Sequence, residues 1–293
     1  MGEFLKEDIK KSLREFYESY GRYGEDTTIL FDQYGTDGLE VRYPLRFMIM
    51  YEGQLNTIKS MVNSGQNILD VGSGDGLLAE TLLKAAKTLT ALDISLRRIK
   101  RCAGRCKNGH FIVADAEELP FKKESFDCVV ASELIEHLIE PEKFLRSTYN
   151  ALKKGGTLII STPSGLFYEN NLDEILKDHH LHTFSPKRLK SLLRKAGFKP
   201  TAIRGMGFKL RMKLPRLLGL FLRIFYAIIT RKRPKRGFIT PVSVEWNLAL
   251  NSLMNKLYIK DKLIYRKLCR FFCRIGDIFP SIASQVIVRA ERL

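Results

Sequence analysis

Short apolar runs alternate with helical patterns from residue 67 onward, and this alternation constrains the fold more than any other feature of the sequence. The runs NILDV (67–71), TLTALDI (88–94) and HFIVA (110–114) are separated by amphipathic stretches of helical length. Strands that alternate with helices form a parallel sheet covered by crossover helices. We therefore predict an α/β fold with a doubly wound, mostly parallel sheet.

Four more extended runs complete a sheet of seven strands. The predicted helix over 141–154 ends at the glycine pair 155–156, and a second helix begins with Ser185 as its N-cap. The strands that follow these patterns are FDCVVAS (126–132), GTLIIS (156–161), FKPTAIR (198–204) and SQVIVRA (284–290). We divide the chain into a helical N-terminal cap (1–60), a sheet domain (61–208 and 282–293) and a helical insertion (209–281).

The net charge of +17 is concentrated in that insertion. Residues 209–275 carry 17 of the 49 Lys and Arg residues but only two of the 32 acids, so the rest of the chain is nearly neutral. The insertion leaves the sheet where a parallel sixth strand ends, which is the edge where such folds bind ligands. Its basic residues therefore describe the surroundings of a substrate.

Two amphipathic segments of the insertion fit an interface between water and lipid. The apolar stretch LPRLLGLFLRIFYAIIT (214–230) is shorter than the ~20 residues that span a bilayer, and bases recur every four residues over 262–274. An anionic membrane surface is thus one predicted partner. A solvated cap over the site is the alternative, and nucleic acid fits less well because aromatic residues lie on the apolar faces.

Neither the cysteines nor the N-terminus points to another class of protein. Cys102 and Cys106, with His110 nearby, lack a fourth ligand at a metal-binding spacing, so we predict reduced thiols and no metal. The first residues have no apolar stretch or cleavage site of a secretory signal. We expect a cytoplasmic protein that can also bind peripherally to the inner face of the membrane.

A glycine turn and two acids mark the predicted ligand site. The segment ILDVGSGDG (68–76) ends the first strand in a sharp bend, and Asp93 ends the second strand, where a carboxylate can bind ribose hydroxyls. Leu77 stands where a dinucleotide fingerprint has its third glycine, which disfavours a pyrophosphate ligand. Asp115 follows the third strand, at a place suited to an adenine amino group.

These motifs together resemble the class I S-adenosylmethionine-dependent methyltransferases, especially their quinone-type O- and C-methyltransferases. ILDVGSGDG is similar to their first motif, ADAEELPF to their adenine loop and FDCVVASELIEHL to their fourth strand. The resemblance covers residues 43 to 204 and the seventh strand. It implies the strand order 3-2-1-4-5-7-6 and S-adenosyl-L-methionine as cofactor. The implied cofactor residues are Asp70, Gly72, Gly74, Gly76, Asp93, Ile94, Asp115, Ala116 and Ser132.

Methyl transfer to an oxygen or carbon acid also needs a base within reach of the acceptor. The candidates at the predicted rim are Glu133 and His137 after the fourth strand, and the three histidines 179, 180 and 182 before Ser185. We favour His182 as base and Glu133 as a group that orients cofactor or substrate, and we expect Glu136 to face solvent.

We therefore expect an enzyme that methylates an oxygen or carbon of a hydrophobic or lipid-like small molecule. One alternative is an RNA methyltransferase that uses the insertion as a phosphate-binding patch. The other is a non-catalytic module that keeps the fold for binding a membrane or a partner. The sequence alone determines neither the acceptor nor the oligomeric state.

Overall fold

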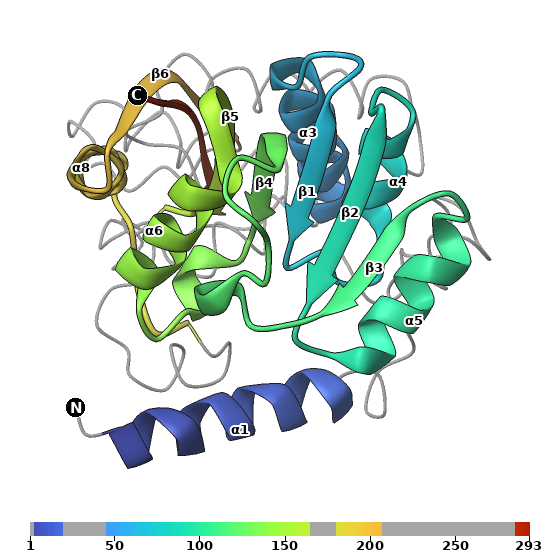
Figure 1. Ribbon diagram of the computed structural model, residues 1–293, viewed down its shortest axis with the longest axis vertical. Coiled ribbons are helices and arrows are strands. Elements are labelled where there is room, and N and C mark those ends of the chain that lie inside the picture. The colour runs from blue at the N-terminus through green and yellow to red at the C-terminus, as the bar shows by residue number, and fades with distance from the viewer. Residues whose placement is uncertain (1–2, 20–44, 165–179, 207–284) are drawn as a thin grey trace, which may run out of the picture.

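The computed structural model describes residues 3–19, 45–164, 180–206 and 285–293 of the chain. Their centre is a seven-stranded sheet (Figure 1). Its strands are β1 (Asn67–Val71), β2 (Thr88–Asp93), β3 (His110–Val113), β4 (Phe126–Ser132), β5 (Leu152–Pro163), β6 (Phe198–Met206) and β7 (Gln285–Arg292). The helices are α1 (Glu3–Ser19), α3 (Leu45–Met61), α4 (Leu77–Leu83), α5 (Leu96–Arg105), α6 (Pro141–Ala151) and α8 (Pro186–Lys195), with short 3₁₀ turns η2 (Ala116–Glu118) and η3 (Ile135–His137).

The order of the strands is β3-β2-β1-β4-β5-β7-β6, as the resemblance to class I methyltransferases implied. The first five strands run parallel, and β7 lies antiparallel between β5 and β6. The order reverses beside β1, where the chain moves to β2 on one side and β4 on the other. The carboxyl ends of β1, β2 and β4 therefore surround a topological switch point, the usual place for a ligand in this class of fold.

Helices cover both faces of the sheet because successive strand side chains point to opposite faces. Leu69 and Val71 of β1 belong to a buried cluster that includes Phe144 of α6 and Leu189 of α8. Ile68, whose side chain points to the other face, belongs to a second cluster with residues of α3, α4 and α5. The apolar run of β1 is thus buried on both faces, which fixes the bend that follows it.

One predicted boundary is wrong. The sequence placed a helix over 141–154 and the fifth strand at 156–161, but α6 ends at Ala151 and β5 begins at Leu152. Leu152 is buried and pairs with Phe126 across the sheet, so strand pairing overrides the helical preference of the two lysines that follow.

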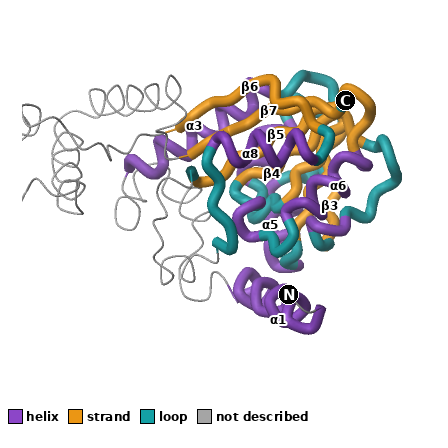
Figure 2. The backbone as a smooth tube through the Cα atoms, turned by 90° about the vertical axis from the view of Figure 1, so that its left-hand side faces the viewer, coloured by secondary structure: helices purple, strands orange, loops and turns teal. Residues whose placement is uncertain are grey.

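The described parts of the predicted N-terminal cap are α1 and α3. Helix α1 lies on the outside of the sheet domain and contacts α5 (Figure 2). The insertion over 209–281 lies outside the described residues, so its helices stay a prediction, as do the domain boundaries drawn around it. Within the described ranges, no helix combines the length and the apolar character needed to cross a bilayer.

Candidate active site

The chain bends sharply after β1 through three glycines with left-handed backbone angles. The φ angles of Gly72, Gly74 and Gly76 are 73°, 54° and 90°, values that residues with a side chain rarely adopt. Space is also short, since a Cβ on Gly72 would lie 3.0 Å from Leu134 and one on Gly76 would lie 2.8 Å from Cys102. The bend therefore requires glycine at these positions.

Asp93 at the end of β2 lies directly against this bend. Its Oδ2 accepts a hydrogen bond from the Gly74 amide at 2.9 Å, and its Oδ1 accepts one from the Ser95 amide at 2.9 Å. Burial raises the pKa of Asp93, although the Ser95 and Gly74 amides work in the opposite direction. The predicted acid and the predicted bend thus meet, while Ile94, the next residue, is partly exposed beside them.

Asp70 near the end of β1 is buried without a full set of partners. The residue is 1% exposed, and its Oδ2 has no hydrogen-bond donor among the described residues. Burial and the nearby charge of Asp93 raise the pKa of Asp70 to about 7. A carboxylate in this position gains most from a cationic donor, such as the ammonium group of an amino acid.

Asp115 opens the adenine loop in a fixed orientation. Its Oδ1 accepts a hydrogen bond from the Glu117 amide at 2.9 Å and thereby caps η2, which begins at Ala116. Its Oδ2 accepts a hydrogen bond from Lys10 of α1 at 2.6 Å, a contact across 105 positions of sequence. No pattern in the sequence indicates this partner.

Ser132 is the last residue of β4, Glu133 follows it, and both belong to one polar network. The Gln54 Nε2 of α3 lies within hydrogen-bond distance of three acceptors, Ser132 Oγ at 3.2 Å, Glu133 Oε1 at 3.0 Å and Ser161 Oγ at 2.7 Å. Ser161 Oγ also lies 3.0 Å from Glu133 Oε1, and the Gln285 amide lies 3.3 Å from Glu133 Oε2. Residues from α3, β5 and β7 thus hold the carboxylate of Glu133.

The backbone and the acidity of Glu133 are both unusual. Its φ angle of 52° is left-handed, which bulky residues adopt only where the surrounding structure holds them. Burial raises the pKa of Glu133 to about 7, although the Ser161, Gln54 and Gln285 donors favour the ionised form. Glu133 can therefore exchange a proton near neutral pH.

The expectation that Glu136 faces solvent is wrong. Its side chain is 2% exposed, and its Oε2 accepts a hydrogen bond from Thr162 of β5 at 2.9 Å. In turn η3 both Ile135 and Glu136 are buried, so the Glu136 side chain points into the protein. Burial, together with the charge of Glu133, raises the pKa of Glu136 well above its usual range.

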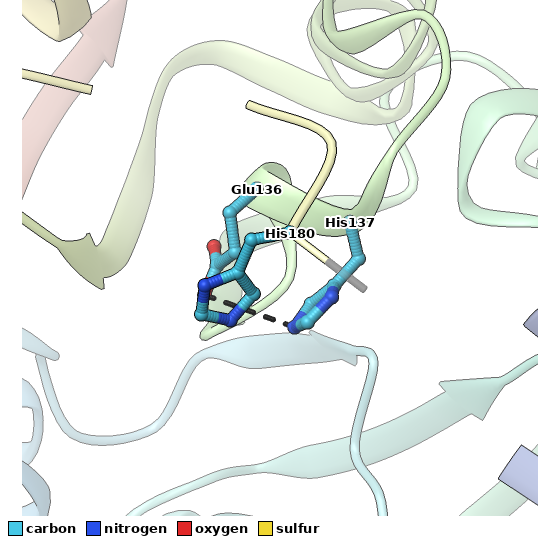
Figure 3. Close-up of side chains that lie close together, drawn as sticks. All are labelled: Glu136, His137 and His180. Carbon is cyan, nitrogen blue, oxygen red and sulfur yellow. Dashed lines mark ion pairs between the residues drawn. The ribbon is translucent and has the colours of Figure 1, made fainter. Parts of the chain in front are cut away.

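Glu136 and His137 are neighbours in the sequence and form a cluster with His180, which lies more than forty positions later (Figure 3). His137 Nε2 lies 3.9 Å from Glu136 Oε1, and the rings of His137 and His180 are 4.7 Å apart between centroids. One ligand atom from each residue lies within 4.8 Å of the others, which a single metal ion could bridge. The prediction of no metal concerned Cys102, Cys106 and His110, and none of these three residues belongs to this cluster.

Stability measurements on Glu136→Gln distinguish a neutral acid from a metal ligand at this cluster. Burial raises the pKa of Glu136 in the folded protein above its ordinary value of 4.5. The folded protein therefore keeps this proton at a pH where the unfolded chain has lost it, and the free energy of unfolding falls as pH rises above 4.5. We expect the variant to match the wild type at pH 4 and to be more stable than the wild type at pH 8. Urea unfolding at both pH values measures this difference. A less stable variant at pH 8, together with a wild type that EDTA weakens, would show that a bound cation holds Glu136 ionised.

His182 lies at the same rim, although its side chain is not part of the cluster. Its backbone amide donates to the Glu136 carbonyl at 3.0 Å, and its ring centre is 6.0 Å from that of Phe184. The side chain is partly exposed. The role of His182 as base stays a prediction, and His179 lies outside the described residues.

Comparison with known proteins agrees with this geometry. The family model described as a methyltransferase domain matches residues 69–160. The ubiquinone/menaquinone biosynthesis C-methyltransferase of Wigglesworthia glossinidia brevipalpis is 31% identical over 184 residues, which cover 58% of this chain and 71% of the relative. The chain belongs to the S-adenosylmethionine-dependent methyltransferases. It is an enzyme of their class I fold, and S-adenosyl-L-methionine is its cofactor.

Two further matches define the extent of the similarity. The human mitochondrial ubiquinone biosynthesis O-methyltransferase is 32% identical over 163 residues, covering 48% of this methyltransferase and 44% of the human protein. The methyltransferase thus spans less than half of that relative. A Thermotoga maritima structure described as a possible histamine N-methyltransferase has a TM-score of 0.54 and 20% identity, covering 90% and 98% of the two chains. At that identity the match shows the fold alone.

The residues around the bend fit the chemical groups of the cofactor. The unpartnered Oδ2 of Asp70 suits the ammonium of the methionyl part. Asp93 suits the ribose hydroxyls, since each of its oxygens keeps an acceptor site beside the amide that it already binds. Asp115 suits the adenine amino group. Each of these residue roles is a proposal that binding measurements can test.

Proposed function

We propose that this methyltransferase transfers the methyl group to an oxygen or carbon atom of a hydrophobic or lipid-like small molecule. The observation that carries the proposal is the carboxylate of Glu133, which follows β4 at the sheet edge where β1 also ends and has a pKa of about 7. An oxygen or carbon acid that is protonated at neutral pH needs such a group to lose its proton. The two relatives, a C- and an O-methyltransferase of quinone biosynthesis, support the same chemistry.

The protein has two tasks in this reaction. When bound, S-adenosyl-L-methionine supplies an electrophilic methyl group, so the site must align the acceptor in line with it and exclude water. The second task is to remove the acceptor proton. Glu133 and His182 are the proposed residues, and the network of Gln54, Ser161 and Gln285 holds Glu133 in one orientation.

Labelled cofactor tests the proposal even while the acceptor is unidentified. Incubation of the enzyme with methyl-labelled S-adenosylmethionine and a lipid and metabolite extract should yield a labelled, chloroform-soluble product of low mass by mass spectrometry. The Glu133→Gln variant serves as a matched control in the same extract. Label that appears only in RNA would support the alternative of an RNA methyltransferase, and cofactor binding without any product would support the non-catalytic module.

Our proposal for where the enzyme meets its acceptor depends on the sequence of the insertion over 209–281, which lies outside the described residues. We propose that its basic amphipathic segments bind an anionic membrane surface, which would make the enzyme a peripheral membrane protein. Binding to vesicles of phosphatidylglycerol and phosphatidylcholine should weaken steeply with salt, since each base near the surface contributes about 1 kcal/mol. RNA of equal charge in the same titration is the comparison. Tight binding to RNA but not to vesicles would overturn this proposal.

A further inference from the structure

Helix α1 crosses the edge of the sheet where the parallel strands end. In Figure 1 it lies along the lower side of the sheet, below the tips of β2 and β3. Lys6 near its start forms an ion pair with Glu140 at 2.8 Å, just before α6. Near its end, the Glu18 carbonyl accepts a hydrogen bond from Arg97 of α5 at 3.2 Å. The helix is thus attached at both ends, on opposite sides of the adenine loop.

Between these two attachments, Lys10 reaches into the adenine loop. Its Nζ lies 2.6 Å from Asp115 Oδ2 and 2.9 Å from Glu117 Oε2. Glu117 is 2% exposed, and its other oxygen accepts the amides of Ile139 and Glu140 at 2.7 and 2.9 Å. Lys10 therefore binds a carboxylate pair that is itself fixed to the sheet domain.

Most of the described attachment of α1 is electrostatic. Among the α1 side chains that the structure describes, only Leu13 is a buried apolar residue, at 8% exposure. Burial lowers the pKa of Lys10, but Asp115 and Glu117 outweigh this effect and raise it, so Lys10 stays charged. Partly exposed ion pairs are weak and sensitive to salt, unlike the apolar contacts that hold α4 or α6. This kind of attachment can open and close during turnover.

From this arrangement we infer that α1 is a lid over the adenine end of the cofactor site, and that Lys10 is the positioning residue that closes it onto Asp115. The inference rests on the proposed role of Asp115 in binding adenine. With the lid closed, Lys10 holds Asp115 Oδ2 in place, and the second acceptor site of that oxygen stays available to the adenine amino group. The cofactor leaves when the contacts of Lys10 break.

The rate of cofactor release tests the lid. We compare the full-length wild type with Lys10→Met by loading tritiated S-adenosylmethionine and chasing with excess unlabelled cofactor. Loss of two ion pairs should speed release by about fivefold or more. Release from the wild type should also become faster between 50 and 300 mM salt, whereas release from the variant should depend much less on salt. Lys10→Arg, which keeps the charge, should restore most of the slow release.

Lys11→Met is the matched control, because Lys11 is the exposed neighbour of Lys10 on the same helix. Its release rate should equal that of the wild type. Equal release from wild type and Lys10→Met, with the same salt dependence, would overturn the lid. Asp115→Ala, which removes the acceptor, tests the underlying assignment separately. If it weakens binding while Lys10→Met changes nothing, the adenine role survives and the lid does not; if Asp115→Ala leaves binding unchanged, the adenine role fails and the lid inference with it.

Discussion

The Asp93→Ala variant is expected to bind S-adenosylmethionine more weakly by about 1 to 3 kcal/mol, or roughly five- to 150-fold in the dissociation constant. Two effects add. The ribose hydroxyls lose their proposed acceptor, and the Gly74 amide loses the carboxylate that holds the bend in place. Isothermal titration calorimetry on the purified variants gives the dissociation constant directly.

Asp127→Ala is the matched control for this measurement. Asp127 also accepts a backbone amide, from Asn67 at 2.8 Å, and it also lies on a strand of the sheet. Asn67 is the first residue of β1, so this contact lies at the edge of the sheet away from the bend. Loss of Asp127 should therefore lower the stability without changing the affinity for the cofactor. If Asp93→Ala is folded and binds as tightly as the wild type, the assignment of Asp93 to the ribose is wrong.

The cofactor end of the site could be predicted from sequence because its parts follow strands in a repeating pattern. Strand alternation placed Asp70, the glycine bend and Asp93 at one edge, and the structure joins Asp93 to the bend by a hydrogen bond through Gly74. Backbone geometry determines this contact, and glycine leaves a clear signal of it. The strand order followed from the resemblance to class I methyltransferases rather than from the strand pattern alone, and the structure has that order.

The other end of the site could not be predicted, because its contacts join residues that no period relates. Gln54 lies 79 positions from Glu133, and Gln285 lies 152 positions away. A single glutamine in an amphipathic helix carries no signal that it is buried. Glu136 shows the same limit, since acids are usually exposed and only the Thr162 hydroxyl and the inward turn of η3 explain its burial.

The contact between Lys10 and Asp115 shows how composition can mislead. Helix α1 is rich in charge, and a charged helix normally indicates a surface exposed to solvent. Some of these charges instead face acids of the sheet domain, at Glu140, Asp115 and Glu117. Such pairing is visible only once the edge of the sheet and the helix are placed in space.

Glu133→Gln is expected to lower kcat by about 100-fold or more, the usual loss when a group that accepts a proton is removed. The pKa of about 7 predicts that the wild-type rate rises with pH through neutrality, because the ionised carboxylate is the active form. Glutamine keeps the shape and cannot ionise, so the remaining rate should show no such rise. Initial rates from pH 5.5 to 8.5 with saturating cofactor measure both effects.

Two comparisons assign the effect to the proton rather than to the fold. Glu124→Gln is a matched control, since Glu124 is the other non-glycine residue in the described ranges with a left-handed backbone, at a φ angle of 58°, and it should keep the wild-type rate and pH profile. His182→Gln tests the rival base. If Glu133 takes the proton, His182→Gln keeps the rise through pH 7 at a lower rate. If the rise disappears in His182→Gln and persists in Glu133→Gln, His182 is the base, and the network around Glu133 only orients the acceptor.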